Sequence, residues 1–340
     1  MSSFSHTGPH IVRLDGHISP VPHFPPTFTH TYTSYDRTPP DTQTIISRLA
    51  DANVAITTRV PISAETIAIC AKRKLKLIAV HAIGYDMVDL KACKEHGIKV
   101  CNVPAASNEA VAEHAIALFF AVRRRVVDMH NLVINTNEWA EKGSLASHFD
   151  GVPVTCRQEV VGIIGVGELG NRVANIFRSL NSTVLLSERP SCPPASTRPG
   201  RTPFVTVLAE STVIIITVPL APTTLNLIST TELSLMKPDA VLINVARGGI
   251  VDEVALVKAL WNRKIAAAAT DVFVEEPAVS ENSVLIKAAK EDALKGRLVL
   301  SPHLAWFARS SVEKLRVTTA TNIEVWARGG DEGWNMVDLE

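Results

Sequence analysis

Four ionisable side chains in the second half of the sequence could together carry out acid–base chemistry on a carbonyl compound. Arg247 lies in NVARGG, Asp271 and Glu276 lie in DVFVEEP, and His303 lies in SPHLAW. A guanidinium can form a forked pair with a substrate carboxylate and polarise the adjoining carbonyl. An imidazole titrates near neutral pH and can protonate a developing alkoxide, while a carboxylate beside the ring stabilises its charged form. These are the groups that the reduction of a carbonyl requires.

Each of these residues alone has an ordinary structural explanation, because an isolated arginine or Glu-Glu pair is usually solvated and an isolated histidine is usually structural. Their positions favour a site. Each segment follows an apolar run that predicts a strand, at residues 240–244, 265–270 and 298–301. Open α/β sheets bind ligands beyond the carboxyl ends of their strands. We therefore expect the arginine, the histidine and the carboxylates to lie at successive strand ends.

The segment VVGIIGVGELG at residues 160–170 predicts a nucleotide-binding turn. An apolar strand leads into Gly165, Gly167 and Gly170, and apolar residues then recur at helical spacing up to Leu180. In this strand–turn–helix context the glycines allow a pyrophosphate to approach the positive end of the helix. The alternative is a glycine-rich turn of some other α/β protein.

Glu188 indicates which dinucleotide is bound. It stands at the end of the next predicted strand, residues 183–187. An acidic side chain there accepts hydrogen bonds from the ribose hydroxyls of NAD and repels the 2′-phosphate of NADP. The neighbouring Arg189 could instead receive a phosphate. The predicted cofactor is therefore NAD (NADH), with NADP possible.

Apolar runs and helical periods predict a two-domain α/β protein. Strands at 10–14, within 50–59, at 75–80 and at 98–103 alternate with helical segments and indicate a small parallel lobe. A largely apolar helix starts after Ser107, and the last helix, with apolar residues from 312 to 326, returns to that lobe. We expect two Rossmann-like domains with parallel sheets. An NAD-binding domain of residues 108–305 would be inserted into a smaller, flavodoxin-like substrate (catalytic) domain of residues 1–107 and 306–340.

Three further segments carry weaker predictions. Residues 139–158 lack periodicity and are interpreted as a linking loop that takes part in a dimer contact. The proline-rich stretch 190–203 is interpreted as a surface loop. The three arginines at 123–125 could form an anion site, but a solvated helix end is preferred because cations are favoured there.

Composition excludes several other classes of protein. The 340 residues are 46% hydrophobic, and 34 basic residues balance 34 acidic ones, so neither nucleic acid nor a membrane is expected as the main partner. Five cysteines without a CxxC pair are typical of reduced thiols. There is no signal-peptide pattern and no apolar run long enough to span a bilayer. We expect a cytoplasmic enzyme without a metal site.

Taken in order, several segments resemble the D-isomer-specific 2-hydroxyacid dehydrogenase family over nearly the whole chain. These are VVGIIGVGELG, TVPLAPTTLNLI, NVARGGIVDE, ATDVFVEEP and SPHLAW, and NVPAASNEAVAEHAIALFFAVRRRV resembles the interdomain helix of that family. VLLSER and the tryptophan after PHLA are most similar to the glycerate dehydrogenase/hydroxypyruvate reductase branch.

The resemblance implies a role for individual residues. Arg247 would bind the substrate and polarise its carbonyl, His303 would be the acid/base, and Glu276 would be the partner of the histidine. The residues implied to line the cofactor are Gly165, Gly167, Glu168, Leu169, Gly170, Glu188, Val218, Pro219, Thr224, Val245, Ala246, Arg247, Asp271 and His303. Those implied to bind the substrate are Ile83, Gly84, Arg247, His303 and Trp306.

The implied activity is the reduction of a 2-keto acid to the D-2-hydroxy acid by hydride transfer from NADH, carried out by a homodimer. The substrate would be similar to hydroxypyruvate or glyoxylate, or larger, because Ile83 replaces the threonine usual in that branch with an apolar side chain. The alternative function is an NAD(H)-sensing, non-catalytic scaffold of the corepressor type, since such proteins share the fold and the same three residues.

Overall fold

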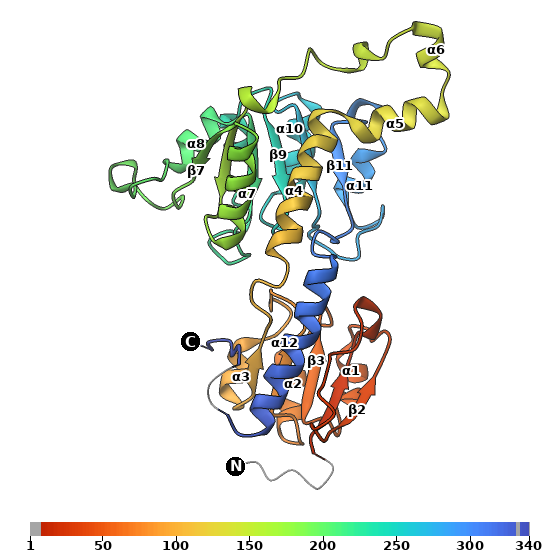
Figure 1. The fold of residues 1–340 in the computed structure, drawn as a ribbon, viewed down its shortest axis with the longest axis vertical. Coiled ribbons are helices and arrows are strands. Elements are labelled where there is room, and N and C mark those ends of the chain that lie inside the picture. Colours follow the sequence, from red (N-terminus) through yellow and green to blue (C-terminus); the bar gives the residue numbers. More distant parts are fainter. Residues whose placement is uncertain (1–7, 331–333, 340) are drawn as a thin grey trace. The chain divides into compact units, whose positions relative to one another are not determined.

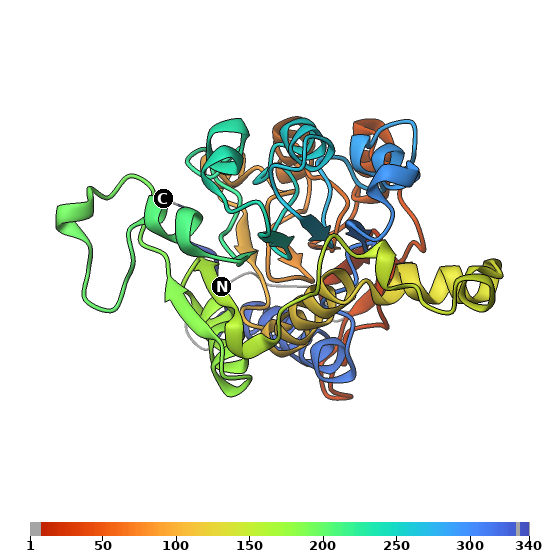
Figure 2. The ribbon, with the colours of Figure 1, turned by 90° about the horizontal axis from the view of Figure 1, so that it is seen from above.

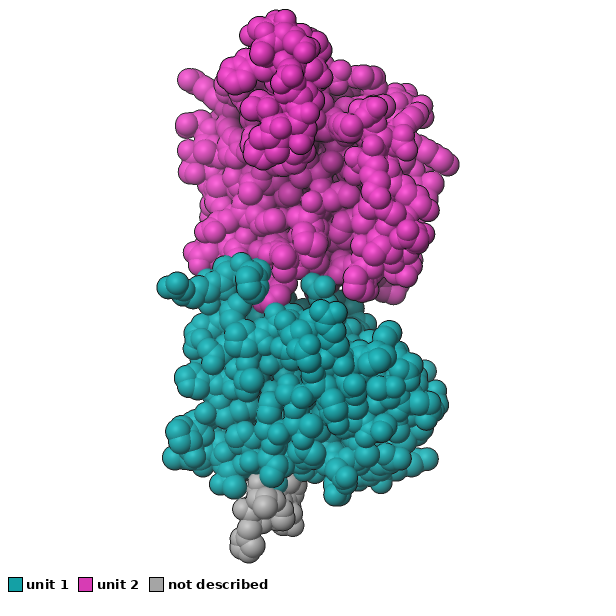
Figure 3. Space-filling model, turned by 90° about the vertical axis from the view of Figure 1, so that its right-hand side faces the viewer, with its two compact units in different colours: residues 1–107, 307–340 teal, residues 108–306 magenta. Residues whose placement is uncertain are grey.

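The chain divides into two compact units in the computed structural model, which describes residues 8–330 and 334–339. Unit 1 contains the described residues up to Ser107 and from Phe307 onward, and unit 2 runs from Asn108 to Trp306 (Figure 3). Each unit has its own parallel sheet.

Unit 1 is built on a five-stranded parallel sheet of order β2-β1-β3-β4-β5 (Figure 1). Its strands are β1 (His10–Arg13), β2 (Thr31–Ser34), β3 (Val54–Thr57), β4 (Leu77–Val80) and β5 (Lys99–Cys101). Its helices are α1 (Thr42–Arg48), α2 (Ala64–Ala71), α3 (Leu90–Glu95) and α12 (Arg309–Ala327). Side chains alternate between the two faces of a strand, so Val12 packs in the core that holds Ile45 of α1, while Ile11 packs in the core that holds Ile323 of α12.

Unit 2 is built on a six-stranded parallel sheet of order β11-β10-β9-β8-β6-β7. Its strands are β6 (Val160–Ile164), β7 (Thr183–Leu186), β8 (Val213–Ile216), β9 (Val241–Asn244), β10 (Ala267–Thr270) and β11 (Leu298–Leu300). Its helices are α4 (Asn108–Arg123), α5 (Val126–Asn135), α6 (Glu138–Lys142), α7 (Glu168–Ser179), α8 (Phe204–Glu210), α9 (Thr230–Leu235), α10 (Glu253–Trp261) and α11 (Val284–Ala289).

Helices cover both faces of the unit 2 sheet, which explains why its strands are apolar on both sides. On one face Val161 and Ile163 pack with α4 and α7, where the rings of Phe119 and Phe177 lie 5.2 Å apart, centroid to centroid. On the other face Ile164 packs in the core that holds residues of α8 to α11. This two-sided burial fixes the strands, and with them the edge from which the predicted site residues emerge.

The strands of unit 2 end together at that edge. Backbone pairing aligns the last residues of five neighbouring strands, which are Ile164, Ile216, Asn244, Thr270 and Leu300. Segments that follow these residues therefore leave the sheet from one side. The glycine-rich turn and the segments of Arg247, Asp271 and His303 all begin within three residues of this line.

The predicted fold class is confirmed, since both units are parallel α/β structures. One segment differs from the prediction. The expected loop at 139–158 contains most of helix α6, and α5 precedes it, so the two helices form an arm that projects from unit 2 (Figures 1 and 2). The proline-rich residues 190–203 form a second projection, which follows β7 and includes a single short turn of 3-10 helix at Pro194–Ser196.

Two of the three arginines at the end of α4 pair with carboxylates, whereas Arg124 is exposed, as expected for a solvated helix end. Arg123 pairs with the buried carboxylate of Glu159, with 2.7 Å between Nε and Oε1. Arg125 pairs with Asp128 at 2.7 Å. The sequence could not show this, because the carboxylate of Glu159 reaches Arg123 only when α4 packs on the sheet.

All five cysteines are free thiols.

Candidate active site

The glycine-rich turn between β6 and α7 is shaped for a phosphate group. Gly165 has a φ of +104°, and a side chain at Gly170 would clash with the Gly165 carbonyl, so strand and helix approach closely. A side chain at Gly167 would instead meet nothing within 4 Å, which leaves open space at the start of α7. The first amides of a helix, here those of Glu168, Leu169 and Gly170, have no intrahelical acceptor. The turn therefore fits a dinucleotide pyrophosphate.

Arg247 is held by a short loop after β9. Asn244 accepts a hydrogen bond from the Ala246 amide at 3.0 Å and donates one to the Arg247 carbonyl at 2.9 Å. The half-buried Arg247 side chain donates to the Ala246 carbonyl at 2.8 Å. An added Cβ at Gly248 would lie 1.8 Å from the Phe273 carbonyl oxygen. The arginine loop therefore packs directly against the loop that carries Glu276.

His303 and Glu276 form a hydrogen-bonded pair, which becomes an ion pair when the histidine is protonated. The Nδ1 atom of His303 lies 2.6 Å from Oε2 of Glu276, and the two side chains are 26% and 21% exposed. Because an ionised carboxylate can only accept, Nδ1 carries the proton and donates. Nε2 is the ring nitrogen suited to exchange a proton with a ligand, and the carboxylate can stabilise the imidazolium. The other oxygen of Glu276 accepts the Phe273 amide at 3.0 Å, which orients the carboxylate.

Asp271 organises the turn that presents His303. Its side chain is 2% exposed, and its oxygens accept the amides of Leu304 at 3.1 Å and Ala305 at 2.8 Å. His303 itself has a φ of +55°, in the left-handed region that is unfavourable for a side-chain-bearing residue. The buried carboxylate thus holds the two residues that follow a strained backbone position.

Two polar residues that sequence reasoning missed complete this turn. Ser301 donates to Asp271 at 2.6 Å, and His114 of α4 lies 2.9 Å from the Ser301 hydroxyl oxygen. Because the hydroxyl proton of Ser301 is donated to Asp271, the serine oxygen accepts a hydrogen bond from the Nε2–H of His114. The sequence signal for His114 was a histidine on a helix that is apolar on most sides.

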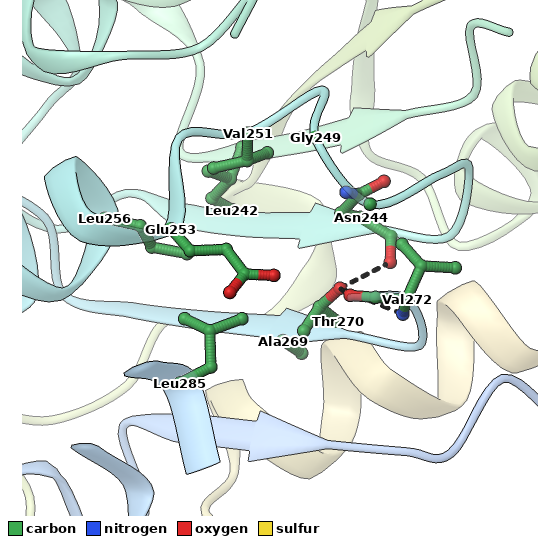
Figure 4. Close-up of a pocket in the computed structure, with 11 residues that line it drawn as sticks. Leu242, Asn244, Gly249, Val251, Glu253, Leu256, Ala269, Thr270, Val272 and Leu285 are labelled. Atoms are coloured by element: carbon green, nitrogen blue, oxygen red, sulfur yellow. Dashed lines mark hydrogen bonds between the residues drawn. The ribbon is translucent and has the colours of Figure 1, made fainter. Parts of the chain in front are cut away.

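Glu253 is a further residue that the sequence did not single out. It lies in a small, mostly apolar pocket among Leu242, Leu256 and Leu285 (Figure 4). Its Oε1 accepts the Val274 amide at 2.8 Å, so it braces the loop of residues 271–277. Burial raises the pKa of Glu253, and the charge of Glu276 raises this pKa further.

The remaining residues predicted to line the cofactor follow the same strand ends. Val218 and Pro219 come directly after β8, and Val245 and Ala246 after β9. Thr224 stabilises the loop beyond β8, because its hydroxyl donates to the Pro219 carbonyl at 2.7 Å and accepts the Ala221 amide at 2.8 Å.

Glu188 follows β7, beside the glycine-rich turn, as predicted. Its carboxylate is 2% exposed and is bound by Arg198 of the proline-rich loop, with 2.5 Å between Nη2 and Oε1. Arg198 was not among the predicted site residues, since ten positions separate it from Glu188 and nothing in the sequence pattern links the two.

The residues predicted to bind the substrate belong to both units. Ile83 and Gly84 form a half-buried turn after β4 of unit 1, where Asn102 donates to the Ile83 carbonyl at 2.7 Å. Trp306, at the end of unit 2, donates from its indole nitrogen to the His303 carbonyl at 3.0 Å. Trp306 therefore supports the histidine turn from its C-terminal side.

The described residues contain neither a membrane-spanning helix nor a metal-binding cluster. Within residues 8–330 and 334–339, no helix combines the length and apolar character needed to cross a bilayer. The same residues contain no cluster of three or more histidine, cysteine or acidic side chains that could hold a metal ion.

Comparison with known proteins identifies the family. Residues 116–305 match the sequence profile of the D-isomer specific 2-hydroxyacid dehydrogenase NAD binding domain. A putative 2-hydroxyacid dehydrogenase of Haemophilus influenzae is 37% identical over 88% of this chain and 91% of its own length. The glycerate dehydrogenase of Methylorubrum extorquens is 35% identical over 89% of this chain and 91% of its own.

A solved structure agrees with these relatives. The NADPH-dependent glyoxylate/hydroxypyruvate reductase of Sinorhizobium meliloti, in complex with NADP and malonate, superimposes with a TM-score of 0.76 at 25% identity, covering 97% of each chain. The predicted family and the predicted class of oxidoreductase are confirmed. This chain, with its dinucleotide-binding turn and the segments of Arg247, Glu276 and His303 at one edge of a parallel sheet, belongs to the D-isomer specific 2-hydroxyacid dehydrogenase family.

Proposed function

We propose that this protein reduces a 2-keto acid to the D-2-hydroxy acid with a reduced nicotinamide dinucleotide. The observation that carries the proposal is the 2.6 Å pair of His303 and Glu276, on the sheet edge that also carries Arg247 and the glycine-rich turn. Family membership supports the same reaction, because relatives include enzymes named glycerate dehydrogenase, glyoxylate reductase and hydroxypyruvate reductase.

In this proposal the chain's own residues bind the substrate and move one proton. Arg247 binds the substrate carboxylate with its forked donors and polarises the carbonyl. His303 gives the proton on Nε2 to the carbonyl oxygen as negative charge develops there, and Glu276 stabilises the charged ring beforehand. The bound nicotinamide supplies the hydride. In the reverse direction His303 accepts the proton of the hydroxyl group.

The cofactor would be held mainly by backbone groups. The amides at the start of α7 would bind the pyrophosphate, and the segments after β8 and β9 would line the rest of the dinucleotide. By this proposal unit 2 is the cofactor-binding domain and unit 1 is the substrate domain.

We propose that Ile83 and Gly84 offer backbone N–H groups to the substrate carboxylate. The side chain of Ile83 would also shift substrate preference toward 2-keto acids with apolar tails, because it offers them an apolar contact. Ile83→Thr tests this. We expect the kcat/KM ratio of a branched-chain 2-keto acid to glyoxylate to fall in this variant, by about tenfold for one well-packed apolar contact. An unchanged ratio would exclude Ile83 from substrate selection.

The direct test is an assay of nicotinamide oxidation by the purified full chain. Glyoxylate, hydroxypyruvate, pyruvate and a branched-chain 2-keto acid are each offered with NADH and with NADPH, and absorbance is followed. We expect turnover of at least one keto acid and a product of D configuration. No turnover with any of them, in a protein that binds the dinucleotide, would refute the proposal.

The alternative of a non-catalytic, NAD(H)-sensing scaffold has no observation in its favour among the relatives or the described residues. The His303–Glu276 pair is compatible with both functions, because scaffolds of the corepressor type share the same three residues. The assay above separates the two functions.

We propose a homodimer formed through the arm of α5 and α6. Apolar side chains are exposed along it, among them Val126 at 54%, Ile134 at 60% and Trp139 at 60%. Of the ten residues of α5, Asp128 alone is buried. An exposed apolar arm of this kind is typical of an oligomer interface.

Light scattering measures the mass directly. We expect a dimer for the wild type and a monomer for Ile134→Glu. The matched control is Val205→Glu, which places the same charge at an exposed valine of α8 and should remain a dimer. A monomeric wild type at micromolar concentration would contradict the proposal.

We also propose a cytoplasmic location. Five free thiols, three of them buried, support a reducing compartment. Recovery of the native protein in a membrane-free, thiol-reduced cell fraction is expected.

A further inference from the structure

The carboxylate of Glu188, predicted to bind ribose hydroxyls, is already fully engaged within the protein. Oε1 accepts the Arg189 amide at 2.8 Å and Nη2 of Arg198 at 2.5 Å. Oε2 accepts Nε of Arg198 at 2.7 Å and the Arg198 amide at 3.2 Å. A carboxylate has about four acceptor positions. All four are therefore occupied.

The segment that carries Arg198 is fastened to the sheet. The Glu188 amide donates to the Thr202 carbonyl and the Thr202 amide to the Leu186 carbonyl, both at 2.8 Å. These bonds add the end of the proline-rich loop beside β7, as a parallel bridge between Ser187 and Thr202. Arg198 is thus presented by an anchored loop next to the glycine-rich turn.

The ion pair changes the electrostatics of this position. The hydrogen bonds from Arg198, followed by that of the Arg189 amide, lower the pKa of Glu188 to about 2, so the carboxylate stays ionised at neutral pH. Its charge is balanced by the guanidinium, and the repulsion that would exclude a second anion is cancelled.

The Arg198 guanidinium also has N–H groups that Glu188 does not engage. A guanidinium carries five N–H groups, and Glu188 engages one on Nε and one on Nη2. The Arg198 side chain is 55% exposed, whereas that of Glu188 is 2% exposed, so the arginine covers the carboxylate and faces outward. The neighbouring Arg189 is also exposed. A dianionic phosphate would find two positive side chains here and no unpaired carboxylate.

We propose that Arg198 determines cofactor choice in this protein and that the chain binds NADPH, with the adenosine 2′-phosphate paired to Arg198. Glu188 acts as a positioning residue for the arginine, in place of the ribose-binding role predicted from the sequence. The inference rests on the proposed dinucleotide site, but it concerns only the adenosine end of the cofactor.

Calorimetric titration of the full-length protein with NADPH and with NADH, without any keto acid, tests the proposal. We expect wild type to bind NADPH at least as tightly as NADH. In Arg198→Ala the Kd for NADPH should rise about tenfold or more, as for a lost charge-assisted pair, while the Kd for NADH falls because Glu188 becomes available to the ribose. Glu188→Gln should retain NADPH binding, since Arg198 remains.

The matched control is Arg178→Ala, which removes one positive charge of the same unit at the far end of α7, where Arg178 contacts Asn175. This variant should leave both dissociation constants unchanged. A wild type that binds NADH more than tenfold tighter than NADPH, or an unchanged NADPH-to-NADH ratio in folded Arg198→Ala, would overturn the proposal. Because no substrate is present, failure of keto-acid reduction would leave this result interpretable.

Discussion

The carboxyl ends of the strands carry an arginine, an acidic residue and a histidine in both sheets. These side chains are buried in unit 1, whereas the histidine of unit 2 is partly exposed. In unit 1, Arg13 is the last residue of β1, and Asp15 and His81 follow β1 and β4; all three residues are at most 1% exposed. In unit 2 the catalytic candidates are partly open, with the His303 side chain 26% exposed. Both histidines follow an apolar strand of a parallel sheet, so topology alone does not distinguish them.

Their partners distinguish them. The Nδ1 atom of His81 contacts the hydroxyl of Thr319 at 2.8 Å, and burial lowers the pKa of His81 to about 3. This histidine is locked in the neutral form. His303 instead lies 2.6 Å from the carboxylate of Glu276, an anionic partner that His81 does not contact through Nδ1. A strand-end histidine is suited to proton transfer when it has both an anionic partner and access to a ligand.

The largest effect is expected from removing the groups that touch the substrate. His303→Ala and Arg247→Ala should each lower kcat/KM by about a thousandfold, through loss of the proton donor or of the carbonyl-polarising charge. Dinucleotide affinity should change little, since it depends mainly on the turn before α7. Steady-state kinetics and titration check both statements, and near-normal turnover in either variant would exclude its residue from catalysis.

Glu276→Gln should make His303 resemble His81, because the side chain beside each histidine would then be neutral. An amide cannot stabilise the imidazolium, so keto-acid reduction should fall about a hundredfold at neutral pH. Steady-state kinetics at neutral pH measure this fall. Near-normal turnover of folded Glu276→Gln would show that Glu276 does not support proton transfer by His303.

Asp271→Asn tests whether the buried carboxylate positions the His303 turn or contacts the cofactor. The asparagine amide group cannot accept both backbone N–H groups, so the turn should loosen and kcat fall about tenfold. If Asp271 only positions the turn, Asp271→Asn should bind the dinucleotide with the same Kd as wild type. A raised Kd with unchanged kcat would instead assign Asp271 to the cofactor. A thermal melt confirms that the variant is folded.

The smallest effect on activity, but a clear one on stability, is expected for His81→Gln. The unfolded chain protonates this histidine near pH 6.5 and the folded chain only near pH 3. The unfolded state therefore binds more protons between these values, so acidification destabilises the wild type, with a slope of at most about 1.4 kcal/mol per pH unit. The glutamine variant should lose this part of the slope and keep its turnover per folded molecule.

Denaturant unfolding at pH 8 and pH 5 measures the change in slope. His96→Gln is the matched control, because His96 is an exposed histidine of the same unit and should leave the slope unchanged. An equal pH dependence in wild type and His81→Gln would show that His81 is not held neutral in the folded protein.

Much of the fold was predictable because its signals are local. The run at 160–164, the glycine spacing that follows it and the helical period up to Leu180 all lie within one strand–turn–helix unit. The same is true of the apolar runs before Arg247, Asp271 and His303. Helices α5 and α6 were missed, since their apolar side chains are exposed on an arm and do not produce the pattern of a helix packed on a core.

The sequence by itself determined the family, the two parallel sheets and the segments that carry the chemistry, because apolar period and glycine spacing reflect the backbone directly. Only the tertiary structure decided which polar groups are paired. It joined Glu188 to Arg198, Arg123 to Glu159 and Asp271 to the amides beyond His303, and it buried His81 while leaving His303 accessible. The reason is physical: a hydrogen bond or an ion pair depends on the distance between atoms that the chain order does not specify, and burial depends on every element packed around a residue.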